Sequence, residues 1–166
     1  FIQEFIENKV SKNWHTINTS NFNGNDENQI FRAFDESLSP PFGDGSRIII
    51  LRNNPIFEKK NEEQSTKFEK IYQNIPKNTF LILQNIKKPD SRLKSTKFIQ
   101  KLIKQNLVKE KSFSLPDIWD YEGQKRYIES AAKSMDLILD KGATDAIIES
   151  VGNDNYKLMN ELQKAK

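Results

Sequence analysis

A short apolar stretch behind a rigid turn is the feature that most limits how this chain can fold. The stretch is Ile-Ile-Ile-Leu at residues 48–51, and it follows Pro-Pro-Phe-Gly-Asp-Gly at residues 40–45. The prolines end a preceding helix, because proline lacks an amide donor and clashes with the previous turn. The glycines allow backbone angles that are closed to other residues. The sequence therefore predicts a tight turn that leads into a strand buried on both faces.

Phe42 lies at the apex of this turn, between the prolines and the first glycine. A large aromatic residue in this position either fills the core of its own domain or projects as a contact for a partner protein. Most large aromatic side chains lie in a core. The residues alone leave both interpretations of Phe42 open.

Composition excludes several kinds of functional site. The chain has 166 residues, of which 36% are hydrophobic and 30% charged, as in a soluble globular protein. It has no cysteine, so disulfides, thiolate metal sites and cysteine nucleophiles are excluded, and its single histidine, His15, cannot form a histidine cluster. A net charge of +3 is too small to indicate nucleic acid by itself. Because no apolar run has the length of a membrane span, we expect a cytoplasmic protein that makes no membrane contact.

Helical and strand patterns alternate through the first two thirds of the chain. This alternation predicts an α/β domain with a parallel sheet that is covered by helices on both faces. An α/β domain rarely begins in a helix, so we expect a further strand upstream. The predicted elements are a helix at 1–10, an extended segment at 13–19, a loop at 21–26, a helix at 25–38, strands at 48–51 and 79–83, a helix at 62–75, a helix at 90–105 with Asp90 as its N-cap, and an edge strand at 107–113.

The pattern changes after Pro116, where helices follow one another without strands. Their predicted ranges are 124–137, 142–151 and 155–164, with Gly152-Asn153-Asp154 as a helix stop and a new N-cap. We therefore predict two domains, 1–115 and 116–166. Asp117, Asp120 and Glu122 are interpreted as a solvated linker that caps the next helix, and no metal site is expected.

Several segments spread over most of the chain carry a resemblance to a known family. They are PPFGDGSR at 40–47, KPDSRLKSTK at 88–97, Trp119-Asp120, Val151-Gly152-Asn153-Asp154 and Asn160-Glu161-Leu162. With them the chain resembles the delta subunit of bacterial DNA polymerase III, especially its cyanobacterial members, within the AAA+ superfamily. The resemblance implies an AAA+-like (RecA-like) sheet domain followed by a small three-helix lid domain. It covers the first two domains of the family. The third, the helical collar domain that joins the clamp-loader ring, has no counterpart here, and the first strand and phosphate loop would lie upstream.

The resemblance also allows the nucleotide site to be tested residue by residue. In an active AAA+ protein, the strand that ends at Leu51 would supply an Asp-Glu pair for Mg²⁺, but Arg52 and Asn53 follow it here. By position, Asn155 replaces the lid arginine that would meet the γ-phosphate, and Asn85 matches the polar sensor position. We therefore expect a degenerate nucleotide site, no cofactor and no hydrolysis. The family as a whole is classed with DNA-directed DNA polymerase (nucleotidyltransferase) holoenzymes.

The function implied by the resemblance is that of a non-catalytic clamp-loader subunit. Such a subunit binds the sliding clamp (the beta subunit) and opens its ring for loading onto primed DNA, and other loader subunits are its further partners. The apolar tip of the family that plugs a pocket on the clamp matches Pro41 and Phe42, with Leu38 as a neighbour. Other members have a second large apolar side chain where this chain has Pro41.

The most basic segment of the chain follows the second strand. Its interpretation stays open between a solvated helix face, a contact with DNA phosphates and a contact with a neighbouring loader subunit. Two alternative functions also stay open: a basic α/β module that binds DNA directly, and a truncated AAA+ nucleotide-dependent enzyme. The basic residues of the segment are Lys87, Lys88, Arg92, Lys94, Lys97, Lys101 and Lys104.

Overall fold

The structure, a computed structural model, describes residues 1–152 and 154–165, and of Lys141 only the backbone. The chain forms two compact units, Phe1–Glu110 and Lys111–Lys166, and each has its own apolar core. The boundary predicted from the sequence comes after residue 115. Each unit is described by itself.

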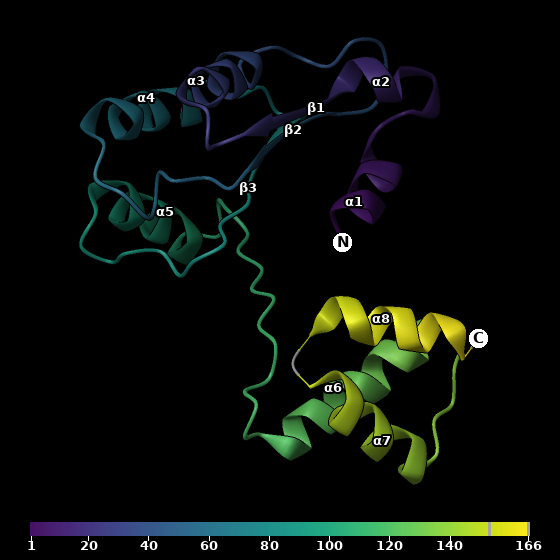
Figure 1. The fold of residues 1–166 in the computed structure, drawn as a ribbon. Coiled ribbons are helices and arrows are strands. Elements are labelled where there is room, and N and C mark those ends of the chain that lie inside the picture. The colour runs from purple at the N-terminus through teal and green to yellow at the C-terminus, as the bar shows by residue number, and fades with distance from the viewer. Residues whose placement is uncertain (153, 166) are drawn as a thin grey trace. The chain divides into compact units, whose positions relative to one another are not determined.

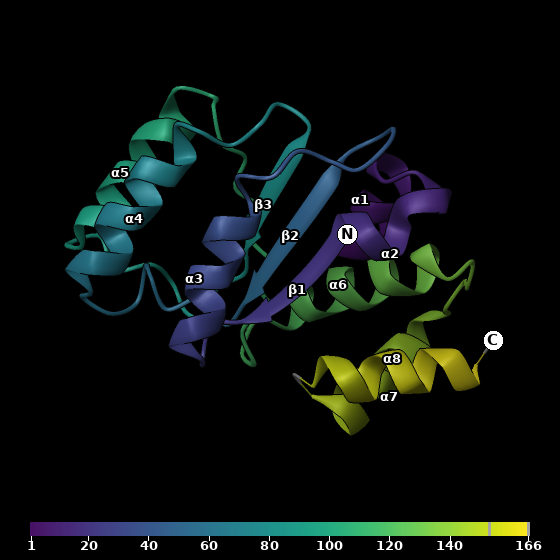
Figure 2. The ribbon, with the colours of Figure 1, turned by 90° about the horizontal axis from the view of Figure 1, so that it is seen from above.

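The first unit is built on a three-stranded parallel sheet with the strand order β1-β2-β3 (Figure 2). Its central strand is β2, in which Ile49 pairs with Ser20 on one side and with Leu81 on the other. The predicted parallel sheet flanked by helices is therefore confirmed. The strands are β1 (Thr19–Asn23), β2 (Arg47–Arg52) and β3 (Thr79–Leu83).

The apolar run of β2 supplies both faces of the sheet. Successive strand side chains point to opposite faces. Ile48 and Ile50 belong to the core that includes Ile6 of the first helix, and Ile49 and Leu51 belong to the core on the other face. Helices cover both faces, as Figures 1 and 2 show. They are α1 (Ile2–Lys9) on the first face and α3 (Glu27–Glu36), α4 (Glu62–Tyr72) and α5 (Lys94–Lys104) on the second.

The segment between α1 and β1 differs from its prediction. The sequence predicts an extended segment at 13–19, but the chain forms the short helices η1 (Lys12–Trp14) and α2 (His15–Asn18). The predicted loop at 21–26 is also wrong, because β1 continues through Asn23. Only Phe22 is buried in this polar strand, so β1 depends on its pairing with β2 rather than on an apolar pattern of its own.

Two further predictions near α5 are wrong. The helix begins at Lys94 and not after Asp90, whose side chain accepts a hydrogen bond from the backbone N–H of Arg92 at 2.9 Å and so stabilises a turn before the helix. Residues 107–113 form no strand. The charged run Lys-Glu-Lys at 109–111 interrupts the segment, and Leu107 and Phe113 are both exposed.

The second unit consists of three helices, as the sequence predicts. Its core contains Ile128, Ala132, Val151, Leu158 and Leu162. An aspartate caps each helix, and Asp120 accepts from the N–H of Gly123, as the capping interpretation requires. The predicted stop and new N-cap are confirmed at Gly152, which ends the second of these helices, and at Asp154, which caps the third. Asn153 lies outside the described residues. Among the described residues, no helix is long and apolar enough to cross a bilayer. The helices are α6 (Tyr121–Ser134), α7 (Lys141–Val151) and α8 (Asn155–Lys164).

Candidate functional site

The loop between α3 and β2 carries the apolar tip predicted from the sequence, which we define as Leu38, Pro41 and Phe42. After α3, Ser37 is fully buried, and its hydroxyl donates to the backbone oxygen of Phe34 at 2.7 Å. The side chains of Leu38 and Phe42 are 40% and 55% exposed. Pro41 is half-buried. Phe42 is therefore a surface residue and not part of the core under the turn.

The ring of Trp14 lies behind the tip. It packs edge to face with Phe42, with 4.7 Å between the ring centroids and 75° between the ring planes. It also lies against Gly43, which has a φ of +67°. The indole fits here because glycine has no side chain: a Cβ on residue 43 would lie 2.3 Å from Nε1 of Trp14. Edge-to-face pairs add attraction beyond the area they bury. The contact therefore holds the Phe42 ring from one side while much of it stays open to solvent.

Asn18 holds the backbone of the tip. Its side chain is fully buried, and its Oδ1 accepts a hydrogen bond from the N–H of Phe42 at 2.8 Å. Its Nδ2 donates to the carbonyl oxygen of the same residue at 2.9 Å. Ile17, the preceding residue, is 51% exposed. The sequence does not mark Trp14 and Asn18 as neighbours of the tip, because their partner Phe42 is distant in the chain.

The carboxyl ends of the strands, where parallel sheets bind ligands, carry hydrogen-bonded amide side chains. Nδ2 of Asn53 donates to Oδ1 of Asn23 at 3.3 Å, and Nδ2 of Asn54 donates to Oδ1 of Asn85 at 3.3 Å. Arg52 donates to Oε1 of Gln84 at 3.4 Å. The structure thus brings together Arg52, Asn53 and Asn85 of the predicted degenerate nucleotide site.

The fourth predicted residue of that site, Asn155, belongs to the second unit. Its Oδ1 accepts a hydrogen bond from the hydroxyl of Tyr127 at 2.8 Å. At the strand ends, residues 52–54 and 84–85 include no carboxylate that could hold Mg²⁺. Among the described residues as a whole, no cluster of acidic or histidine side chains has the arrangement of a metal site.

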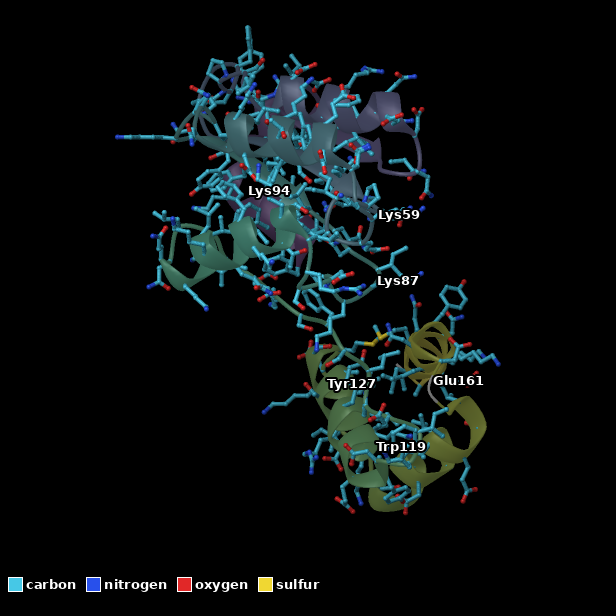
Figure 3. All side chains as sticks on the ribbon, turned by 90° about the vertical axis from the view of Figure 1, so that its left-hand side faces the viewer. Lys59, Lys87, Lys94, Trp119, Tyr127 and Glu161 are labelled. Atoms are coloured by element: carbon cyan, nitrogen blue, oxygen red, sulfur yellow. The ribbon has the colours of Figure 1, made fainter. Side chains whose placement is uncertain are left out.

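The basic segment forms a lysine stripe on α5, which we define as Lys94, Lys97, Lys101 and Lys104. Residues three and four apart lie on the same face of a helix, and all four lysines are exposed. The opposite face packs into the unit through residues such as Leu102, which is buried. Lys94 forms an ion pair with Glu69 at 3.3 Å, and Figure 3 labels it. Within the described part of the chain, no ion pair neutralises the other three.

The remaining basic residues precede the helix. Lys87, labelled in Figure 3, and Lys88 are exposed on the loop after β3. Arg92 pairs with Asp90 at 2.7 Å. The hydrogen bonds from the side chain and backbone of Arg92 lower the pKa of Asp90 to about 2. Arg92 is thus partly neutralised by a local carboxylate, whereas the lysines of the stripe after Lys94 are not.

A family model described as "DNA polymerase III, delta subunit" matches residues 2–111, which include the tip, the strand ends and the lysine stripe. The chain belongs to the DNA polymerase III delta subunit family. The resemblance drawn from the sequence is therefore confirmed. A search of curated proteins gives no match.

A solved structure supports the same fold for the delta-family chain. The Bacillus subtilis DNA clamp loader delta protein (YqeN) matches with a TM-score of 0.73 and 17% sequence identity. The match covers 98% of this chain and 47% of the Bacillus chain, so this chain spans about half the length of that relative.

Proposed function

We propose that this protein is a non-catalytic clamp-loader subunit that binds the sliding clamp through the apolar tip and opens the clamp ring. Its other partners are the remaining clamp-loader subunits and primed DNA within the complex. Family membership and the delta-type fold support the loader assignment. The single observation that carries the contact is the exposure of Phe42 at the end of a rigid, proline-backed loop.

The tip has the physical properties of a binding anchor. Full burial of a Phe side chain contributes about 1.5–3 kcal/mol from its area alone. Large aromatic anchors in desolvated pockets are typical hot spots of protein interfaces. Pro40 and Pro41 limit the conformations of the loop, and Trp14 already holds one side of the ring. Docking of Phe42 therefore costs less conformational entropy than docking of a flexible loop.

The strand ends support a role without catalysis. The side chains of Asn53, Asn54 and Asn85 are hydrogen-bonded to other amides, and an Mg²⁺ site for phosphoryl transfer needs carboxylate ligands. In this proposal, ATP bound by other subunits supplies the energy for loading. Steady ATP hydrolysis by the purified protein alone would contradict it and favour the nucleotide-dependent enzyme.

Clamp affinity of tip variants tests the proposal. Phe42→Ala is expected to weaken binding to the purified sliding clamp by about tenfold or more in surface plasmon resonance, because about 1.4 kcal/mol of contact energy corresponds to tenfold in affinity. Phe113→Ala is the matched control, since Phe113 is also an exposed phenylalanine. Equal affinity of the Phe42→Ala variant and the wild type would refute the tip as the clamp contact.

The lysine stripe supports a second candidate, contact with DNA phosphates. Each lysine that neutralises a phosphate steepens the salt dependence of binding. Replacing Lys97 and Lys101 by alanine should weaken binding to a primed duplex and reduce the salt slope by about one for each lost contact. Replacing Lys157 and Lys164, which are exposed on α8, is the control. If DNA binding by both double variants has the same salt slope, the stripe is a solvated helix face or a site for another loader subunit.

A further inference from the structure

The loop that carries the tip has few anchors near its apex. At its ends, the hydroxyl of Thr79 donates to the backbone oxygen of Ser39 at 2.8 Å, and the N–H of Ser46 donates to the oxygen of Lys9 at 3.0 Å. Between these ends, Pro40 and Pro41 offer no backbone donor. For residues 40–44, the hydrogen bonds that the described residues make to the loop all come from Asn18.

The amide of Asn18 suits this task. It uses one acceptor and one donor on the two backbone groups of Phe42, in the manner of a strand residue that pairs with its neighbour. Asn18 is fully buried, so water cannot easily replace either bond. Because both bonds go to the backbone, they fix where residue 42 lies and leave its ring free to contact Trp14 and a partner.

We propose that Asn18 is the positioning residue of the clamp contact, holding the backbone of Phe42 so that the ring is presented to the clamp pocket. This inference rests on the proposed function. Asn18 itself does not touch the clamp, and it acts through Phe42. When its amide is lost, the N–H and C=O of Phe42 lose their partners, the apex samples other conformations, and only a fraction of molecules present the ring correctly. The apparent clamp affinity is then the intrinsic affinity multiplied by that fraction.

The experiment compares Asn18→Ala, Asn18→Asp and Asn54→Ala in the complete chain. Asn54 is the matched control, because it is also a fully buried asparagine that bonds backbone and side-chain groups, at the strand ends instead of the tip. The readouts are clamp affinity and hydrogen exchange of the Phe42 amide measured without clamp. All variants are compared at a temperature at which circular dichroism shows them folded.

Asn18→Ala should speed exchange of the Phe42 amide by about tenfold or more through local opening. Clamp binding should weaken in proportion to the loss of molecules that still present the ring. Asn18→Asp keeps an acceptor for the Phe42 N–H, but its second carboxylate oxygen would lie against the Phe42 carbonyl oxygen and repel it in a buried place. Its clamp affinity should therefore also fall below that of the wild type. Asn54→Ala should lower overall stability without changing either tip readout.

The outcomes separate this inference from the proposed function. If Phe42→Ala weakens clamp binding but neither Asn18 variant does, the positioning role is overturned and the clamp contact stands. If exchange of the Phe42 amide is unchanged in both Asn18 variants, the role is overturned whatever the clamp affinity is. If Phe42→Ala binds like the wild type while Asn18→Ala speeds exchange, the amide holds the loop but the clamp contact fails, and with it the positioning role.

Discussion

Asn54 and Asn85 join the ends of two neighbouring strands by a pair of hydrogen bonds. Nδ2 of Asn54 donates to Oδ1 of Asn85 at 3.3 Å, and Nδ2 of Asn85 donates to the backbone oxygen of Asn54 at 3.2 Å. Oδ1 of Asn54 also accepts from the N–H of Ile56 at 3.1 Å. The polar groups of the buried Asn54 are thus used within the fold, at the carboxyl ends of the parallel strands.

Replacing Asn54 by alanine should lower the free energy of unfolding by about 1–3 kcal/mol, because it leaves the Ile56 N–H and part of the Asn85 amide without partners in a buried place. Urea denaturation followed by circular dichroism measures the change. Asn28→Ala is the control, since Asn28 is exposed on α3 and should alter stability by less than about 0.5 kcal/mol. Equal midpoints for the two variants would show that the strand-end network does not stabilise the fold.

The sequence predicts the parts of the fold that have strong apolar patterns. The run Ile-Ile-Ile-Leu identifies β2 because each of its residues has a buried place on one face or the other. The polar strand β1 has only Phe22 in a core, and pairing with β2 determines it, so local pattern cannot find it. Asp90 is a good N-cap residue, but its bond to Arg92 makes a turn before α5 begins.

The candidate site also has a part that the sequence predicts and a part that it does not. The prolines, Phe42 and the two glycines all lie within residues 40–45, so the turn and its aromatic residue are visible as a motif. Asn18 and Trp14 come from a segment predicted as extended, and they meet Phe42 only because η1 and α2 fold beside the loop. Nothing in the local sequence marks an asparagine that bonds two backbone groups of a residue 24 positions away.

The cores of the two units should respond separately to cavity mutations. Ile49 and Leu162 are both fully buried, the first in the sheet unit and the second in the helical unit. Truncating either to alanine removes about 2–5 kcal/mol of stability through lost burial and a residual cavity. Hydrogen exchange with mass spectrometry should show faster exchange in β2 and α3 for Ile49→Ala, and in α6 and α8 for Leu162→Ala. Equal loss of protection in both units from either change would contradict independent cores.

The Asp90–Arg92 pair should respond to acid. Hydrogen bonds from Arg92 lower the pKa of Asp90 from 3.8 to about 2, so the folded state holds this carboxylate ionised more strongly than the unfolded chain does. The contribution of Asp90 to stability is therefore complete above about pH 3.8 and is lost as the pH falls toward 2. NMR titration of the Asp90 carboxyl measures the pKa, and Arg92→Ala should return it toward 3.8. An unchanged titration in that variant would assign the shift to another group.

Replacing Gly43, which follows Phe42 of the tip, should lower stability for two separable reasons. Its φ is +67°, a conformation that costs an L-residue about 1–2 kcal/mol, and a Cβ there would overlap the Trp14 indole at 2.3 Å from Nε1. Gly43→Ala should therefore lower stability, displace Trp14 from Phe42 and weaken clamp binding, as near-ultraviolet circular dichroism and surface plasmon resonance would record.

Gly152 separates the two causes in the Gly43 experiment, because its φ is +58° but nothing lies within 4 Å of a Cβ placed there. Gly152→Ala pays a similar backbone cost in the helical unit without any clash. We expect Gly43→Ala to lose more stability than Gly152→Ala, because only Gly43→Ala adds an overlap with Trp14 to the backbone cost. Only Gly43→Ala should lose clamp affinity and the Trp14 signal. If both variants bind the clamp equally well, the packing of Trp14 against the Gly43 backbone has no part in presenting Phe42.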